Sequence, residues 1–244
     1  MVSNLLGKKK IHCVFTSPPY GVGVDYGDTY VDSFENLRKS LKILAESWAK
    51  IVVAGGFAVV NFGDIVSARK FLETDEPCEY PMALEYWGPF RGAGWLLWSR
   101  RIWCKPVSAT GSLQCVNSNR AATNWEHVWT WKKPGKPIVE RQTSGEYASQ
   151  NGWFDSIGNP LGIGLDVHGA GMPVKVALHG ISNHSHEGDN VLEPFCGTGT
   201  TLIAAEQLGR RCYAIEISPA YCDIIIARWE KFTGKKAVRV SAGA

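Results

Sequence analysis

The first stretch whose residue types could do chemistry is Ser17-Pro18-Pro19-Tyr20, which follows the apolar run IHCVFT. Proline lacks an N–H donor and holds its φ near −65°, so the two prolines form a stiff corner. The corner fixes where the Pro18 carbonyl points and removes competing N–H groups. It therefore presents a hydroxyl, an oriented carbonyl oxygen and an aromatic ring within four residues.

The second stretch is EPFCGTGTT at 193–201, where a buried strand passes through a glycine turn into a helix. Gly197 and Gly199 allow close approach to the backbone, and Glu216 ends the next strand, where a carboxylate binds ribose hydroxyls. Position 202 is Leu, so the third glycine of G-x-G-x-x-G is absent and a pyrophosphate cradle is disfavoured. The turn predicts a nucleoside cofactor without a pyrophosphate, such as S-adenosylmethionine. The alternative is a tight turn that binds nothing.

Other residues of this turn are candidates for the same cofactor. Thr200 and Thr201 begin the helix, where a hydroxyl and the helix N-terminus suit a carboxylate. Phe195 packs either against the cofactor or into the core. The predicted cofactor-binding residues are Phe195, Gly197, Thr198, Gly199, Thr200, Thr201 and Glu216.

The elements that position both stretches follow from the hydrophobic periodicity. Strands are expected at 11–16, 57–64, 99–104, 125–131, 190–195, 211–217 and near 237–240. Helices are expected at 34–53, ended by Gly55-Gly56, and at 65–73, about 80–95, 173–182, 200–208 and 219–233. Seven strands interleaved with helices predict an α/β fold with an open, mainly parallel sheet covered by helices on both faces.

Composition narrows the class of protein. No apolar run reaches the length of about 18 residues that a transmembrane helix needs, and the N-terminus lacks a signal-peptide core. The seven cysteines are scattered and form no C-x-x-C pair, which argues against a disulfide framework or a zinc site. A reduced, cytoplasmic setting is expected. Residues 91–141 hold nine basic and two acidic residues, which indicates either a polyanion partner or a solvated basic face.

The two stretches resemble the motifs of the amino-directed DNA methyltransferases. TSPPY resembles their catalytic [DNS]-P-P-[YFW] motif, and EPFCGTGTT resembles their D-P-F-x-G-[ST]-G-T-T cofactor motif. The catalytic motif comes first, which resembles the circularly permuted β group. The resemblance covers roughly 11–232 and includes GGFAVVNFGD, RIWCKP, NWEHVWTWKKPGKP and HGAGMPVKVALHGI. Glu193 replaces the usual Asp, and the region available for target recognition is short.

This resemblance implies a Rossmann-like class I methyltransferase fold with a seven-stranded sheet. It implies a single methyltransferase domain over 1–244, with a small target-recognition segment at 132–167. The implied activity is site-specific methylation of an exocyclic amine in DNA by S-adenosylmethionine. Ser17 in the first motif position favours the 4-amino group of cytosine over the 6-amino group of adenine.

The implied chemistry assigns roles to the corner. The Ser17 hydroxyl and the Pro18 carbonyl accept hydrogen bonds from the amine, which favours a more tetrahedral, more nucleophilic nitrogen. Pro19 stiffens the corner, and Tyr20 stacks on the base, which must leave the duplex. The nitrogen then attacks the sulfonium methyl and loses its proton afterwards, so no strong base is required.

The resemblance implies double-stranded DNA as the partner, with neither a metal nor a membrane. Expected contacts to DNA come from residues in and near the Gly-, Pro-, Ser- and Asn-rich stretch after 132, namely Lys132, Lys133, Lys136, Arg141 and Trp153. Such a protein would be prokaryotic or phage-encoded and would work at the nucleoid in the cytoplasm. A homodimer and a cognate restriction nuclease remain open.

Four other readings have sequence support. A protein-amide methyltransferase uses a similar N-P-P-Y corner, and an inactive DNA-binding relative could keep the fold. Pro77-Cys78 matches the nucleophile of cytosine carbon-5 methylation, but it lies in a charged stretch and in the wrong order relative to the glycine turn. His184 and His186 form an H-x-H pair, for which a surface loop is favoured over a metal site.

Overall fold

Strands and helices alternate along most of the chain. The computed structural model describes residues 9–25, 30–65, 79–105, 125–140, 152–154 and 172–240. The strands are β1 (Ile11–Thr16), β2 (Val22–Asp25), β3 (Val31–Ser33), β4 (Val52–Phe62), β5 (Leu96–Cys104), β6 (Trp125–Lys132), β7 (Gly152–Phe154), β8 (Asn190–Glu193) and β9 (Arg211–Ala214). The helices are α2 (Phe34–Ile51), α4 (Ala83–Gly92), α5 (Val174–Ser182), α6 (Thr200–Gln207) and α7 (Pro219–Thr233).

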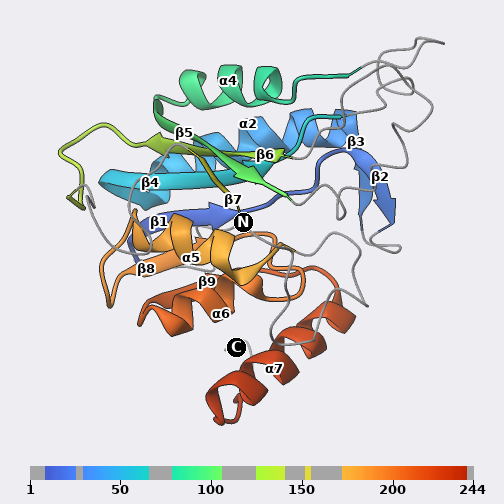
Figure 1. The fold of residues 1–244 in the computed structure, drawn as a ribbon, viewed down its shortest axis with the longest axis vertical. Helices are drawn as coiled ribbons and strands as arrows, with labels where there is room; N and C mark the ends of the chain where they lie inside the picture. Colours follow the sequence, from blue (N-terminus) through green and yellow to red (C-terminus); the bar gives the residue numbers. More distant parts are fainter. Residues whose placement is uncertain are drawn as a thin grey trace.

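The main sheet has seven strands in the order β7-β5-β6-β4-β1-β8-β9. Among these described strands, β6 runs against its two neighbours, and the other neighbouring pairs are parallel. Helices α2 and α4 cover one face, and α5, α6 and α7 lie on the other (Figure 1). The prediction of an open, mainly parallel sheet between two helical layers is confirmed. A separate antiparallel pair is formed by β2 and β3.

Helix α2 ends earlier than the sequence predicted, and for a different reason. Val52 already has extended backbone, with φ −73° and ψ 139°, and it begins β4. Gly55 and Gly56 therefore lie inside the strand rather than ending the helix. A methyl group at Gly55 would lie 1.7 Å from the carbonyl oxygen of Lys136, and the Gly55 φ is +75°. The glycine serves the close approach of the segment that follows β6.

The prediction of a strand near 237–240 is wrong. Residues 235–240 form no regular structure, and Val238 and Val240 are 83% and 85% exposed, so none of the described strands lies beside this segment. The seventh strand of the sheet is instead β7, which pairs with β5. It lies in the Gly-, Pro-, Ser- and Asn-rich stretch after 132, where no strand was predicted. The helix expected at 65–73 lies outside the described residues except for Ile65, which forms a single bridge with Tyr80.

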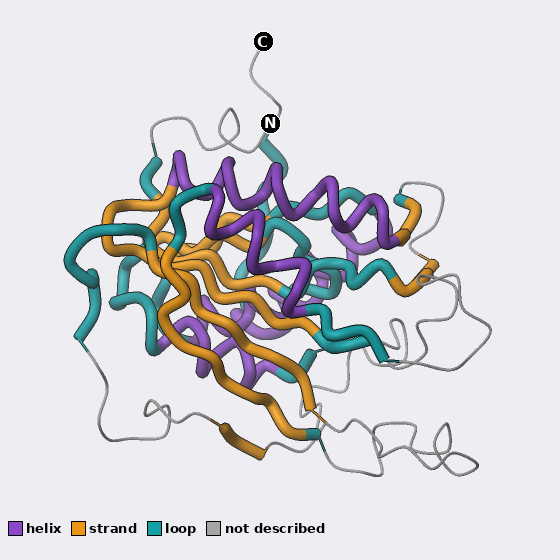
Figure 2. The backbone as a smooth tube through the Cα atoms, turned by 90° about the horizontal axis from the view of Figure 1, so that it is seen from above, coloured by secondary structure: helices purple, strands orange, loops and turns teal. Residues whose placement is uncertain are grey.

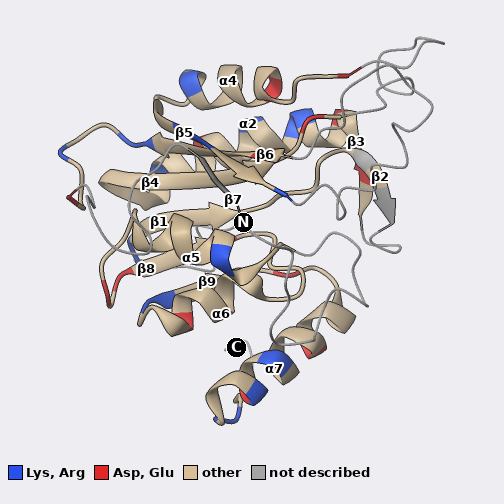
Figure 3. Cartoon of the chain, in the orientation of Figure 1, with Lys and Arg blue, Asp and Glu red and all other residues tan. Residues whose placement is uncertain are grey.

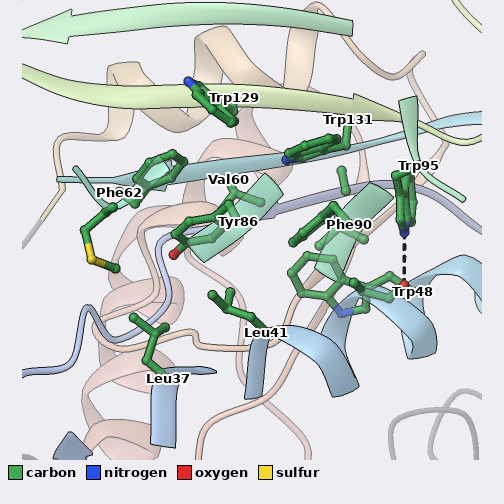
Figure 4. Packing of buried hydrophobic residues seen from close by; sticks show 14 of the residues in the cluster. Leu37, Leu41, Trp48, Val60, Phe62, Tyr86, Phe90, Trp95, Trp129 and Trp131 are labelled. Atoms are coloured by element: carbon green, nitrogen blue, oxygen red, sulfur yellow. Dashed lines mark hydrogen bonds between the residues drawn. The ribbon is translucent and has the colours of Figure 1, made fainter. Parts of the chain in front are cut away.

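Each face of the sheet carries its own core. On the face of α2 and α4, large aromatic side chains interlock, and Phe90 stacks on Trp131 with ring centres 4.9 Å apart. The Trp95 indole N–H donates to the Ala45 carbonyl of α2, at 2.9 Å. This hydrogen bond is the dashed line that begins at Trp95 in Figure 4. On the other face, α5 packs so closely on β1 that a methyl group at Gly180 would lie 2.1 Å from the Phe15 ring. Helix α5 therefore packs directly against β1.

The parallel strands bring distant parts of the sequence to one edge. β1, β4, β8 and β9 run in the same direction and lie side by side. The view from above shows the strands of the sheet next to one another (Figure 2). Their last residues are therefore neighbours at what we call the carboxyl edge. The proline corner follows β1 and the glycine turn follows β8, so both begin at this edge.

Candidate active site at the carboxyl edge of the sheet

The proline corner and the glycine turn are joined by a buried hydrogen bond. The Thr16 hydroxyl donates to Glu193 Oε1 at 2.5 Å. Thr16 directly precedes Ser17, and Glu193 begins the EPFCGTGTT stretch. Since β1 and β8 are adjacent parallel strands, the two predicted motifs lie next to each other although 177 positions separate the bonded residues.

The Glu193 side chain connects several elements at the carboxyl edge. Its second carboxylate oxygen accepts from the Thr201 hydroxyl at 2.5 Å, and the Phe195 amide donates to Oε1 at 2.9 Å. The side chain is fully enclosed, and burial raises the pKa of its carboxyl from 4.5 to about 7 although three donors lower it. One acidic side chain therefore connects β1, β8 and α6.

The glycine turn has the shape and the charge that a nucleoside cofactor requires. Gly197 and Gly199 have φ of +52° and +86°, which a side chain rarely tolerates. The Gly197 amide donates to Glu216 Oε2 at 2.7 Å, so the carboxylate lies directly beside the turn. A methyl group at Gly197 would meet nothing within 4 Å, which shows open space there. Open backbone beside a carboxylate fits an adenosyl group.

The threonines of the turn face inward instead. The buried Arg228 guanidinium of α7 donates to the Thr198 carbonyl at 3.0 Å and to the Thr200 hydroxyl at 3.2 Å. The Thr201 hydroxyl is bound to Glu193. The Thr200 and Thr201 hydroxyls, which were predicted to bind a cofactor carboxylate, therefore bind Arg228 and Glu193 and hold the turn in place. Sequence reasoning missed Arg228, because only the fold brings α7 under the turn.

The proline corner is linked to a polar network that the motif alone did not reveal. Ser17 Oγ lies 3.0 Å from the Tyr20 hydroxyl. The Tyr20 hydroxyl lies 3.2 Å from Glu126 Oε2 and 3.4 Å from Asn61 Oδ1. Burial and the nearby Glu126 carboxylate raise the pKa of Tyr20 well above its usual value, so the phenol stays neutral. Glu126 in turn pairs with Lys105 through its other oxygen.

The backbone after the corner is fixed by a single carboxylate. Asp32 is 5% exposed and accepts from the amides of Gly21 and Gly23, at 2.8 and 3.1 Å. A methyl group at Gly21 would lie 2.9 Å from the Phe34 Cα, and the Gly21 φ is +74°. The corner is therefore anchored to the start of α2 as well as to the sheet.

The lysines predicted to contact DNA lie away from the carboxyl edge. Lys132 is 5% exposed and its ammonium donates to the Gly135 carbonyl at 2.7 Å, while the Lys133 ammonium donates to the Val52 carbonyl at 2.6 Å. Val52 begins β4, so this group lies at the end of the sheet opposite the carboxyl edge, where Lys136 is exposed. Figure 3 shows Lys and Arg on the helices of both layers rather than on one face. Arg141 and the side chain of Trp153 lie outside the described residues.

The H-x-H pair lies in the loop between α5 and β8, as expected, but only one of its two side chains reaches the surface. His186 is exposed, but His184 is 3% exposed, with Nδ1 2.6 Å from the Gly180 carbonyl. Burial lowers the pKa of His184 to about 3, so the ring is neutral. Within the described ranges, no cluster of His, Cys, Asp or Glu could hold a metal ion, and no helix is long and apolar enough to cross a membrane. Pro77-Cys78 lies outside those ranges.

Known proteins are similar to this chain in sequence. Residues 11–227 match the family model described as DNA methylase. The chain is 31% identical to the type II methyltransferase M.BglI of Bacillus subtilis over 57% of its own length, which spans 40% of that protein. It is 28% identical to the type II methyltransferase M.MthZI of Methanothermobacter thermautotrophicus, over 92% of this chain and 73% of that protein.

A solved structure agrees with the fold. TTHA0409 of Thermus thermophilus, proposed to be a DNA modification methylase, was crystallised with S-adenosyl-L-methionine. It superposes with a TM-score of 0.68 and 25% identity, covering 91% of this chain and 86% of that one. The family match covers nearly the whole described fold, including both motifs. The chain therefore belongs to the DNA methylase family, whose amino-directed members use S-adenosylmethionine as methyl donor.

Proposed function

We propose that this protein methylates the 4-amino group of cytosine in double-stranded DNA, on a base turned out of the duplex. The observation that carries the proposal is the buried Thr16–Glu193 hydrogen bond, which holds the proline corner against the glycine turn. A methyl donor in the turn and an amine at the corner would then be neighbours. Holding two reactants in this way can account for a large part of a rate enhancement.

The glycine turn and Glu216 would hold the cofactor. Gly197 offers open backbone, and the Glu216 carboxylate stays fixed by the amides of Ile217 and Ser218, both at 2.9 Å. When bound, S-adenosylmethionine supplies a methyl group on a positively charged sulfur, and the electron pair of the broken carbon–sulfur bond stays with that sulfur. Phe195 is partly exposed beside the turn and is a candidate for contact with the adenosyl group.

The corner would act on the base. Ser17 Oγ and the Pro18 carbonyl accept hydrogen bonds from the two N–H groups of the amine, which concentrates the lone pair on the nitrogen. That nitrogen forms the new bond to the methyl carbon and afterwards releases a proton to water. The Tyr20 ring offers a stacking surface that recovers about 1–3 kcal/mol of the cost of extruding the base.

Cytosine is preferred to adenine because position 17 is a serine. A neutral hydroxyl in this position resembles the cytosine-directed members of the family, and an aspartate resembles the adenine-directed ones. Adenine remains the alternative base. We further propose that the 132–167 segment reads the target, with Arg141 and Trp153 as its remaining DNA contacts, and that the protein works at a prokaryotic nucleoid.

Transfer of a labelled methyl group separates this proposal from its rivals. The protein is incubated with labelled S-adenosylmethionine, duplex DNA of varied sequence and a protein extract, and label is counted in each polymer. Label in DNA supports the proposal, and label in protein alone points to an amide methyltransferase. Calorimetric titration of the protein with S-adenosylmethionine tests for an inactive DNA-binding relative, which need not bind the cofactor.

A further inference from the structure

The network behind the proline corner has a direction that follows from counting protons. Ser17 Oγ, the Tyr20 hydroxyl and Glu126 Oε2 form a chain with separations of 3.0 and 3.2 Å. A hydroxyl has one proton to donate and two lone pairs that accept. The carboxylate at one end can only accept, so the chain can run from Ser17 through Tyr20 to Glu126.

The reverse direction would spoil the site for an amine. If Tyr20 donated to Ser17, the serine proton would be free to point at the incoming base, whose amine also presents hydrogens. Two donors facing each other cannot bond, so Ser17 must direct its own proton elsewhere. The Tyr20 oxygen, 3.0 Å away, is the acceptor that the structure offers. Since the raised pKa of Tyr20 keeps its phenol protonated, that proton is available for Glu126.

Glu126 is a stronger acceptor for Tyr20 than its competitor. Asn61 is held with its amide N–H on the His127 carbonyl at 3.0 Å, which leaves Oδ1 facing Tyr20 at 3.4 Å. Glu126 is closer, and a charged acceptor makes a stronger hydrogen bond than a neutral amide. Lys105 pairs with the other carboxylate oxygen, and both side chains are mostly shielded, at 12% exposure for Glu126 and 23% for Lys105.

We infer that Glu126 is a positioning residue that acts through the Tyr20 hydroxyl to turn the Ser17 proton away from the target amine. Both lone pairs of Ser17 Oγ that face the base are then acceptors before the substrate arrives. This assigns Tyr20 a second task beside stacking, and it gives the Glu126–Lys105 pair a part in the reaction. The inference rests on the proposed methylation of an amine.

The test separates the hydroxyl from the ring. Tyr20→Phe keeps the stacking surface, and Glu126→Gln keeps the shape of the side chain while removing its charge. We expect each change to slow single-turnover methylation about tenfold to a hundredfold, the usual cost of losing a charge-assisted hydrogen bond. The affinities for DNA and for S-adenosylmethionine should stay unchanged, because the loss falls on the chemical step. The double variant should be no slower than the slower single variant, since both break one chain.

The protein contains a matched control outside the proposed site. Tyr80 bonds to Glu85, which pairs with Arg38 at 2.8 Å, so a tyrosine, a carboxylate and a cation again form a series of polar contacts. Tyr80→Phe and Glu85→Gln should leave the methylation rate unchanged. Cofactor binding by calorimetry confirms that each variant is folded.

Three outcomes overturn the inference. A rate for Tyr20→Phe equal to that of the parent would exclude the hydroxyl, and single losses that multiply in the double variant would exclude a shared chain. Losses confined to DNA affinity would assign Glu126 to binding instead. If the parent protein transfers no methyl to DNA, both the proposed function and this inference fail. If the parent is active and the variants are unaffected, only this inference fails.

Discussion

At the scale of single residues, the site depends on carboxylates whose positions the fold sets. Glu216 and Ser17 could be predicted because each belongs to a short motif with a mechanical reason for its residue types. Glu126 and Arg228 could not, because their partners are distant in the sequence. The Tyr20–Glu126 pair spans 106 positions and the Arg228–Thr198 pair spans 30. Only the sheet and helix packing bring these groups together.

Glu193 makes the stability of the folded protein depend on pH. Its pKa is raised from 4.5 to about 7, mainly by burial. Between these values the folded state holds more protons than the unfolded chain, so the free energy of unfolding falls as pH rises through this window and levels off above it. Glu193→Gln should remove this part of the dependence and stabilise the protein at pH 8 by up to about 3 kcal/mol.

Urea unfolding at pH 5 and pH 8 measures this difference. The glutamine can accept from Thr16 and Phe195 and donate to Thr201, so the fold should survive. Glu46, which is exposed on α2, provides the control, and Glu46→Gln should unfold like the parent at both pH values. Equal pH dependence in the parent and in Glu193→Gln would show that Glu193 is not held in the way described.

At the scale of elements, α5 fixes the position of β1 and so of the corner that follows it. Gly180 of α5 has the Phe15 ring where a methyl group would go, at 2.1 Å. Gly180→Ala should therefore destabilise the protein by about 1–3 kcal/mol, the usual cost of overpacking. Gly92→Ala, at the end of α4 with open space around it, should change stability by less than about 0.5 kcal/mol. Thermal or chemical unfolding of both variants decides the matter, and equal stabilities would contradict this packing.

The sequence predicted elements well where one periodicity dominated and poorly where a tertiary contact decided. The hydrophobic period located α2 and α7 and the buried strand β1. It failed at Gly55, where the approach of residues 134–138 rather than helix termination explains the glycine. It also failed at Lys132 and Lys133, whose charges suggested a polyanion but which bind backbone carbonyls. A lysine that caps carbonyls and one that binds phosphate look alike in sequence.

At the scale of the whole molecule, β1 and β8 are adjacent, so segments near the two ends of the sequence form one site. Cofactor binding should therefore stabilise the entire fold and not a local segment. At a hundred times the dissociation constant, S-adenosylmethionine should add about 2.7 kcal/mol to the free energy of unfolding. For a chain of this size the midpoint temperature should rise by about 5–10 °C.

The shift should be specific to the type of cofactor. Leu202 stands where a pyrophosphate-binding turn has its third glycine, so NAD at the same concentration should leave the midpoint unchanged. Glu216→Ala should abolish the shift with S-adenosylmethionine. A shift with NAD of equal size would mean that the turn binds nucleotides in another way.

The central claim is that the corner at Ser17 and the turn at Gly197 form one methyl-transfer site for a DNA amine. The most direct measurement is mass spectrometry of nucleosides from DNA treated with the protein and isotopically labelled S-adenosylmethionine, for the parent and for Ser17→Ala. We predict labelled 4-methylcytosine from the parent, and a loss of about a hundredfold or more in Ser17→Ala with unchanged cofactor affinity. Unlabelled DNA from the parent, or equal product from both proteins, would contradict the account.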